Sequence, residues 1–131
     1  MKLRIITATI TLPTSPDVVY SALLDSKKHS TFTGSKAVIG KKIGDSFSVY
    51  DGYATGRQLE LIPSKLLVQT WRASDWPAGH YSTVSFELMK RDGKTILHFQ
   101  QTEIPDSEMQ VDEKAWEKYY WKPLKEYFKR S

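Results

Sequence analysis

The sequence of 131 residues contains no cysteine. This absence excludes disulfide bonds, thiolate zinc sites, cysteine nucleophiles and iron–sulfur clusters. It also fits a reducing compartment, and we expect a cytoplasmic protein. The remaining chemistry must come from other residue types.

Long hydrophobic runs are also missing. No stretch approaches the run of about 20 apolar residues that spans a bilayer. The N-terminal residues 1–6 lack the apolar centre and the small-residue cleavage site of a signal peptide. They are typical of a first strand instead, and we expect no membrane insertion.

Catalytic and metal-binding signatures are absent as well. The histidines are His29, His80 and His98, and none belongs to a metal-binding pattern such as two histidines four residues apart with a glutamate. The sequence has no nucleophile elbow, phosphate-binding glycine loop or dinucleotide fingerprint. Asp75 and His80 lie near two serines, but a triad requires hydrogen-bond geometry rather than proximity in sequence. We therefore expect no enzyme, no metal site and no cofactor.

The charge is moderate, with a formal net charge of +4. A basic balance favours acidic partners in general. No recognition motif for nucleic acid accompanies it, so we interpret the charge as a solvated surface and expect no nucleic-acid partner.

The first part of the chain predicts one strand and two helices. Residues 3–12 are rich in isoleucine and threonine and predict a strand, which Pro13 ends. Ser15 is a good helix N-cap with Pro16 at the first helical position, so a helix is expected over 16–24. A second short helix is expected over 26–32.

From residue 38 the hydrophobic period changes to two, which is typical of strands. Turn signals separate the runs, among them Asp51-Gly52 and Asp92-Gly93, whose residue types suit the positive φ angles of tight hairpins. Six strands in series with short turns predict an antiparallel meander. The alternating apolar positions are Val38-Ile39, Phe47 and Val49, Leu59 and Leu61, Leu66 and Val68, Val84, Phe86 and Leu88, and Leu97 and Phe99.

A long helix is expected over 111–130. Trp116, Tyr120, Leu124 and Tyr127 share one face, and a stripe of lysines (114, 118, 122, 125 and 129) lies nearly opposite. The aromatic face must be buried, and the concave face of the sheet is the large partner available. The sequence thus predicts a single α+β domain over 1–131, with a curved antiparallel sheet of about seven strands packed on a long C-terminal helix.

Pro123 lies inside this helix. It cannot donate a backbone hydrogen bond to the Tyr119 carbonyl, and its ring crowds that carbonyl. We expect a kink above about 20° over 119–123, with the helix continuing to at least Tyr127. The alternative is that Pro123 ends one helix and a second begins.

The loop between the strands near residues 71 and 82 carries a second tryptophan, Trp76, at its tip. A tryptophan in a loop is typical of interface hot spots, so Trp76 is a candidate partner-binding anchor. Arg72 and Asp75 could support it by pairing across the loop. The alternative is that Trp76 folds back over one end of the sheet or helix.

Three segments together resemble a known family. They are Phe47 to Gly56, the stretch from Trp71 to Tyr81 with its Trp-Pro-Ala-Gly-His-Tyr, and the helix from Trp116 to Leu124. They are similar to the C-terminal domain of the activators of heat shock protein 90 ATPase, and the resemblance covers about residues 3–128. This family belongs to the START-like, helix-grip superfamily. Eukaryotic activators also carry a separate N-terminal domain, and we expect no such domain within these 131 residues.

The resemblance implies a cavity between the sheet and the long helix that holds a small apolar or amphipathic ligand. The candidate lining residues are Val49, Leu59, Phe86, Phe99, Trp116 and Tyr120. The alternative is that these bulky side chains fill the space completely. The resemblance also implies a second function, a co-chaperone-like domain that binds and stimulates a chaperone of the heat shock protein 90 type.

Overall fold

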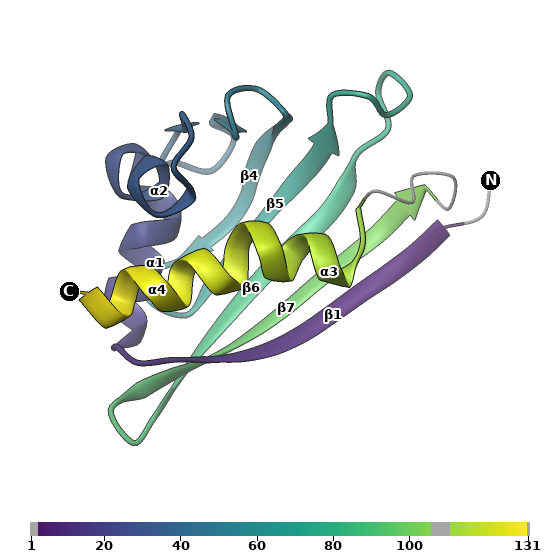
Figure 1. Cartoon of the computed structure of the whole chain (residues 1–131). Coiled ribbons are helices and arrows are strands. Elements are labelled where there is room, and N and C mark those ends of the chain that lie inside the picture. The colour runs from purple at the N-terminus through teal and green to yellow at the C-terminus, as the bar shows by residue number, and fades with distance from the viewer. Residues whose placement is uncertain (1–2, 106–110, 131) are drawn as a thin grey trace.

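The computed structural model describes residues 3–105 and 111–130 (Figure 1). A curved sheet forms one layer, and a long C-terminal helix lies across its concave face. Two short helices lie beside the end of the sheet at which the long helix ends, where Phe32 contacts Tyr127. The elements in chain order are β1 (Leu3–Leu12), α1 (Pro16–Leu24), α2 (Ser26–Thr33), β2 (Val38–Ile39), β3 (Ser46–Val49), β4 (Ala54–Ile62), β5 (Leu66–Ala73), β6 (Ser82–Arg91), β7 (Lys94–Pro105), α3 (Glu113–Trp116), the π-helical segment η1 (Glu117–Trp121) and α4 (Lys122–Arg130).

The sheet has seven strands in the order β1-β7-β6-β5-β4-β3-β2, and every neighbouring pair is antiparallel. Strands β2 to β7 form the expected meander, and β1 pairs with β7 at the far edge. The predicted α+β class and the seven-stranded antiparallel sheet are confirmed, and the architecture is that of the helix-grip fold.

The β6–β7 hairpin shows why the local signals were informative. Asp92 and Gly93 have φ angles of 51° and 76°, and the flanking residues Arg91 and Lys94 are paired. Two successive positive φ values define the tight turn whose twist matches that of the strands. The Asp-Gly pair therefore fixes the register of the two longest meander strands.

The aromatic face of the C-terminal helix is buried as predicted. The exposed fractions of Trp116, Tyr120 and Leu124 are 4%, 6% and 0%. On the opposite side Lys118 and Lys129 are exposed, whereas Lys125 is half-buried. The helix begins at Glu113, because the Asp112 carboxylate caps it by accepting a hydrogen bond from the Ala115 amide at 2.8 Å.

The middle of this helix is wound as a π-helix. Over Glu117–Trp121 the bonds run five residues back, as in the Lys122 amide donating to the Glu117 carbonyl. The wider turn shifts the helix phase, so Trp121 joins Trp116 on the inner face, with the two rings nearly parallel at 5.6 Å. After the π-helical segment Phe128 points to the inner face and is buried, whereas Tyr127, which was expected there, is only half-buried.

Pro123 lies just after this π-helical segment. The helical residues continue without a break to Arg130, so the expectation of one helix past Tyr127 is confirmed and the alternative of two separate helices is wrong. The predicted bend angle stays a prediction. A π turn before a proline is one of the ways in which a helix accommodates the missing donor.

Pro123 has no backbone N–H to donate to the Tyr119 carbonyl. This carbonyl instead accepts a hydrogen bond from the Tyr50 hydroxyl. Tyr50 belongs to the turn between β3 and β4, where Tyr50, Asp51 and Gly52 all have positive φ angles of 51°, 54° and 91°. This bond ties the turn to the helix, across 69 residues of sequence.

We expect Tyr50→Phe to lower the free energy of unfolding by about 0.5–1.5 kcal/mol, because it removes the donor to this carbonyl. In a Pro123→Ala background the loss should be smaller, since the alanine amide can donate to Tyr119 in an ordinary helical turn. Urea unfolding of the wild type, both single variants and the double variant measures this coupling. Tyr81→Phe, at an exposed tyrosine, is the control. Additive losses in the double variant would contradict the coupling.

Candidate functional site

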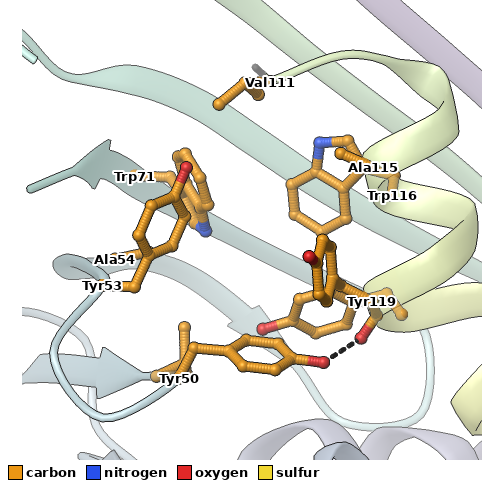
Figure 2. A pocket seen from close by; sticks show the side chains of 10 residues that line it. Tyr50, Tyr53, Ala54, Trp71, Val111, Ala115, Trp116 and Tyr119 are labelled. Atoms are coloured by element: carbon orange, nitrogen blue, oxygen red, sulfur yellow. Dashed lines mark hydrogen bonds between the residues drawn. The ribbon is translucent and has the colours of Figure 1, made fainter. Parts of the chain in front are cut away.

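An open pocket of about 470 Å³ lies between the β3–β4 turn and the C-terminal helix. The β3–β4 turn and the end of β5 form one side, and α3 and η1 form the other (Figure 2). The lining residues are Val49, Tyr50, Tyr53, Ala54, Trp71, Val111, Ala115, Trp116, Tyr119 and Tyr120.

Aromatic rings make most of the pocket wall, and they touch one another. The ring centroid of Trp71 lies 6.2 Å from that of Tyr53 and 5.6 Å from that of Trp116. These ring contacts close the back of the pocket. The chain of contacts continues from Trp116 to Tyr120 at 4.9 Å and from Tyr120 to Tyr50 at 5.9 Å. Rings that brace one another in tilted and edge-on contacts form a stiff wall.

Two alanines account for the open space. Ala54 begins β4 and Ala115 lies in α3, and both line the pocket. Protein interiors otherwise pack to crystal density, so a small side chain on each side leaves room that larger ones would fill. The interior behind this pocket, between the sheet and the helix, keeps only about 10 Å³ of space among side chains that include Phe86, Trp116 and Tyr120. The alternative of bulky side chains that fill the space therefore describes that interior, whereas the end of the sheet at Ala54 and Ala115 is open.

A buried hydrogen-bond chain fixes the ring of Trp116 at the centre of the wall. Its indole N–H donates to the Gln101 side-chain oxygen at 2.8 Å, and the Gln101 amide nitrogen donates to the Ser82 hydroxyl at 3.0 Å. The Ser82 hydroxyl in turn donates to the Trp71 carbonyl at 2.7 Å. The helix, β7, β6 and β5 are thus joined by one polar path through the core.

A second buried chain runs from the pocket floor into the helical end. The Leu23 carbonyl lies 3.1 Å from Nδ1 of His29, so this nitrogen carries the proton. Nε2 of His29 then accepts from the Tyr120 hydroxyl at 3.0 Å. Burial lowers the pKa of His29 from its ordinary value of 6.5 to about 4, and the imidazole is neutral at pH 7.

The two pocket tyrosines with buried or half-buried hydroxyls are also held neutral. Burial raises the pKa of Tyr50 to about 12 and raises the pKa of Tyr120 further still. No charged side chain is among the described residues that line the pocket. The site is therefore an uncharged aromatic surface at physiological pH.

Three of the six predicted cavity residues line the open pocket, and Phe86 joins them around the nearly filled space behind it. Val49, Trp116 and Tyr120 line the pocket. Phe86 and Phe99 instead lie in the core behind it, where Phe99 packs on Trp116 at 4.4 Å and on Phe86 at 5.3 Å. They support the wall without being part of it.

The prediction that Leu59 lines the cavity on the inner face of the sheet is wrong. Ala54, Gly56 and Gln58 point inward along β4, so Leu59 points outward and is 47% exposed. The pairing of β4 with β5 shifts register between Gln58 and Glu60, which is typical of a β-bulge. After the bulge Leu61 points to the inner side of the sheet and packs against the core, whereas Leu59 does not.

The prediction of an exposed anchor at Trp76 is wrong, and the alternative is correct. Trp76 is 3% exposed and packs edge-on against Trp71 at 5.5 Å. Arg72 does not pair with Asp75. Its guanidinium donates to the Pro77 carbonyl at 3.0 Å and to the Trp76 carbonyl, which holds the loop closed, while Asp75 is exposed.

Seven pocket residues are not among the predicted cavity residues, and four of them are aromatic: Tyr50, Tyr53, Trp71 and Tyr119. Tyr50 and Tyr53 flank the Asp51-Gly52 turn, and two aromatic rings beside a tight turn were the available signal. Tyr119 belongs to an aromatic run whose three members cannot all face the core in an ordinary helix. Only the docking of turn and helix brings them together.

Within the described residues no group of three or more histidine, cysteine, aspartate or glutamate side chains could hold a metal ion. The polar side-chain groups of the pocket are tyrosine hydroxyls and the indole N–H of Trp71, around an apolar space.

Comparison with known proteins places the chain in a family. The sequence profile described as "Activator of Hsp90 ATPase homolog 1-like protein" matches residues 13–129. This chain belongs to that family. The resemblance expected from the three sequence segments is thereby confirmed.

Curated relatives agree with this family assignment. The "Activator of 90 kDa heat shock protein ATPase homolog 1" of Homo sapiens is 30% identical over 123 residues, which cover 94% of this chain and 36% of that protein. A Dictyostelium discoideum homologue is 31% identical over 121 residues, covering 89% of this chain and 31% of that protein. This family member thus spans about a third of the length of these relatives.

Solved structures share the fold. An HSP90 activator from Plasmodium falciparum superposes with a TM-score of 0.76 at 26% identity, covering 87% of this chain and 83% of that one. A protein from Mesorhizobium loti reaches 0.83 at 18% identity, covering 98% of both chains. The Aha1 dimer from Colwellia psychrerythraea reaches 0.78 at 17% identity, covering 95% of this chain and 96% of that one. The last two likenesses bear on the fold alone.

Among the described residues, no helix of this family member has both the length and the apolar character that crossing a membrane requires.

The buried His29 predicts a pH dependence of stability. Its pKa is lowered in the folded state, so the unfolded chain binds more protons between pH 6.5 and pH 4. Its contribution is therefore complete above about pH 6.5 and is lost as the pH falls toward 4, by about 3 kcal/mol in total. Urea unfolding across this range, for the wild type and His29→Gln, measures the difference. The variant should have the shallower profile. Parallel profiles would contradict a neutral His29.

Proposed function

We propose that this chain is a START-like binding domain that holds a small apolar or amphipathic ligand in the pocket between the β3–β4 hairpin and the C-terminal helix. One observation carries the proposal, which is the open, uncharged, aromatic-lined space of about 470 Å³. Small-molecule sites generally have volumes of about 300–1,000 Å³ and mostly apolar walls with a few polar groups.

The energetic basis is the burial of apolar ligand surface against rings that are already ordered. Tyr50, Tyr120 and Trp116 are held by hydrogen bonds to the Tyr119 carbonyl, His29 and Gln101. A wall that is fixed before binding loses little conformational entropy when the ligand arrives. Apolar contact gains roughly 25 cal/mol per Å² of surface removed from water.

Native mass spectrometry of gently purified protein tests whether a ligand is retained. We further expect the neutral dye N-phenyl-1-naphthylamine to bind with a rise in fluorescence. Ala115→Phe should weaken its binding by about tenfold or more, because the new ring occupies the pocket. Glu126→Phe, at an exposed position on the same helix, is the matched control and should leave binding unchanged. Equal binding by both variants would place the dye elsewhere and contradict the proposal.

The second candidate function is binding to a chaperone of the heat shock protein 90 type. The 30% identity to the activator of Homo sapiens favours it. Because Trp76 is buried, it cannot serve as an exposed anchor, and the basic stripe of the C-terminal helix is the candidate contact. Lys114, Lys118, Lys122 and Lys129 are exposed along it and would suit an acidic chaperone surface.

We expect Lys118→Glu with Lys122→Glu to weaken chaperone binding by about tenfold or more and to remove most of its salt dependence. The control is Lys65→Glu with Lys94→Glu, which changes the net charge equally on exposed residues away from the helix. Surface plasmon resonance at two salt concentrations measures both pairs. If the two pairs lose affinity equally, the effect is one of net charge and the helix stripe is not the contact.

A further inference from the structure

The indole N–H of Trp71 has no hydrogen-bond partner among the residues that the structure describes, although the side chain is only 5% exposed. The neighbouring Trp116 differs, since its N–H donates to Gln101. Trp71 lines the pocket, and Figure 2 shows its ring nitrogen on the side of the space between the two walls. A donor is therefore presented inside the pocket.

The pocket is open, so water can pair with this N–H when no ligand is bound, and a ligand that displaces the water loses affinity unless it replaces that hydrogen bond. The pocket is where a partner for this N–H can enter. The partner must accept a hydrogen bond, because an indole N–H can only donate.

The walls restrict the rest of the ligand. Trp71 and Tyr53 lie on one side of the space, and Trp116 and Tyr119 lie on the other (Figure 2). Trp71 and Trp116 meet at the back of this space, and the aromatic rings that surround it favour a flat, conjugated molecule that can pack against them. The lining residues include no lysine or arginine for an anion and no carboxylate for a cation.

A cationic ligand is the alternative that ring faces would also accept. The Trp71 N–H, however, presents the positive end of its dipole to the pocket. The ammonium of Lys118 already lies 5.2 Å from the centre of the Tyr119 ring, on a surface with a net charge of +4. Both features disfavour a second cation.

We propose that the pocket recognises a flat, uncharged, conjugated ligand whose carbonyl-type oxygen accepts a hydrogen bond from the Trp71 indole N–H. This rests on the proposed ligand-binding function and names the class of ligand. Trp71 is then the specificity-determining residue of the pocket.

The test compares two bicyclic probes that differ by one carbonyl group, 1-indanone and indane. Both are titrated into the wild type, Trp71→Phe and Trp76→Phe, with binding followed by two-dimensional ¹H–¹⁵N NMR. Trp71→Phe keeps an aromatic ring and removes the donor. Trp76→Phe removes the N–H of a tryptophan that touches Trp71 without lining the pocket, and it is the matched control.

We expect Trp71→Phe to weaken 1-indanone by about threefold to tenfold, the worth of one hydrogen bond, and to change indane by less than about twofold. Trp76→Phe should change neither. In the wild type the assigned Trp71 indole resonance should move downfield with 1-indanone and not with indane, a readout that holds even if a variant fails to fold.

Other outcomes separate the two proposals. Binding of both probes at the pocket, with no special shift of the Trp71 resonance, would overturn the hydrogen bond and leave the ligand-binding function standing. Absence of binding by either probe at pocket residues would overturn both. Tighter binding of choline than of its uncharged analogue 3,3-dimethylbutanol would overturn the uncharged class in favour of a cation.

Discussion

The packing of Trp116 against the concave sheet is the interaction on which the rest of the structure depends. Its ring contacts Trp71 from β5 and Phe99 from β7, and its N–H reaches Gln101 through the core. One side chain therefore fixes the distance between the helix and several strands at once. A large aromatic residue suits this place, because it combines a large apolar contact area with one directional hydrogen bond.

The π turn follows from that constraint. Trp116, Tyr120 and Trp121 are all buried, and an ordinary helix cannot direct side chains four and five residues apart equally well to one face. The wider turn does so, and Pro123 immediately after it has no amide to lose. The Tyr119 carbonyl that remains is exposed toward the β3–β4 turn, where the Tyr50 hydroxyl meets it. The pocket rim is thus a consequence of how the helix reaches the sheet.

Local patterns predicted the strands, the helices and the burial of Trp116, since alternation and helical spacing depend on neighbours in sequence. What failed depended on distant contacts. Leu59 was assigned inward because the bulge that shifts β4 against β5 has no mark in the sequence. Trp76 was assigned outward because its partner Trp71 lies across a loop closed by Arg72. Tyr50 and Tyr53 become pocket residues only when their turn meets the helix.

The two candidate functions use different side chains of the same helix, and this makes them compatible. The inner side presents Ala115 and Trp116 to the pocket, whereas the outer side presents lysines such as Lys118 and Lys122 to solvent. Coupling between the two sides requires an element whose state both can bias. The π turn is the natural candidate, because Tyr119 lies in the pocket lining while its carbonyl binds Tyr50 and its ring lies beside Lys118. A ligand that displaced the Tyr119 ring would also move a charge on the outer face.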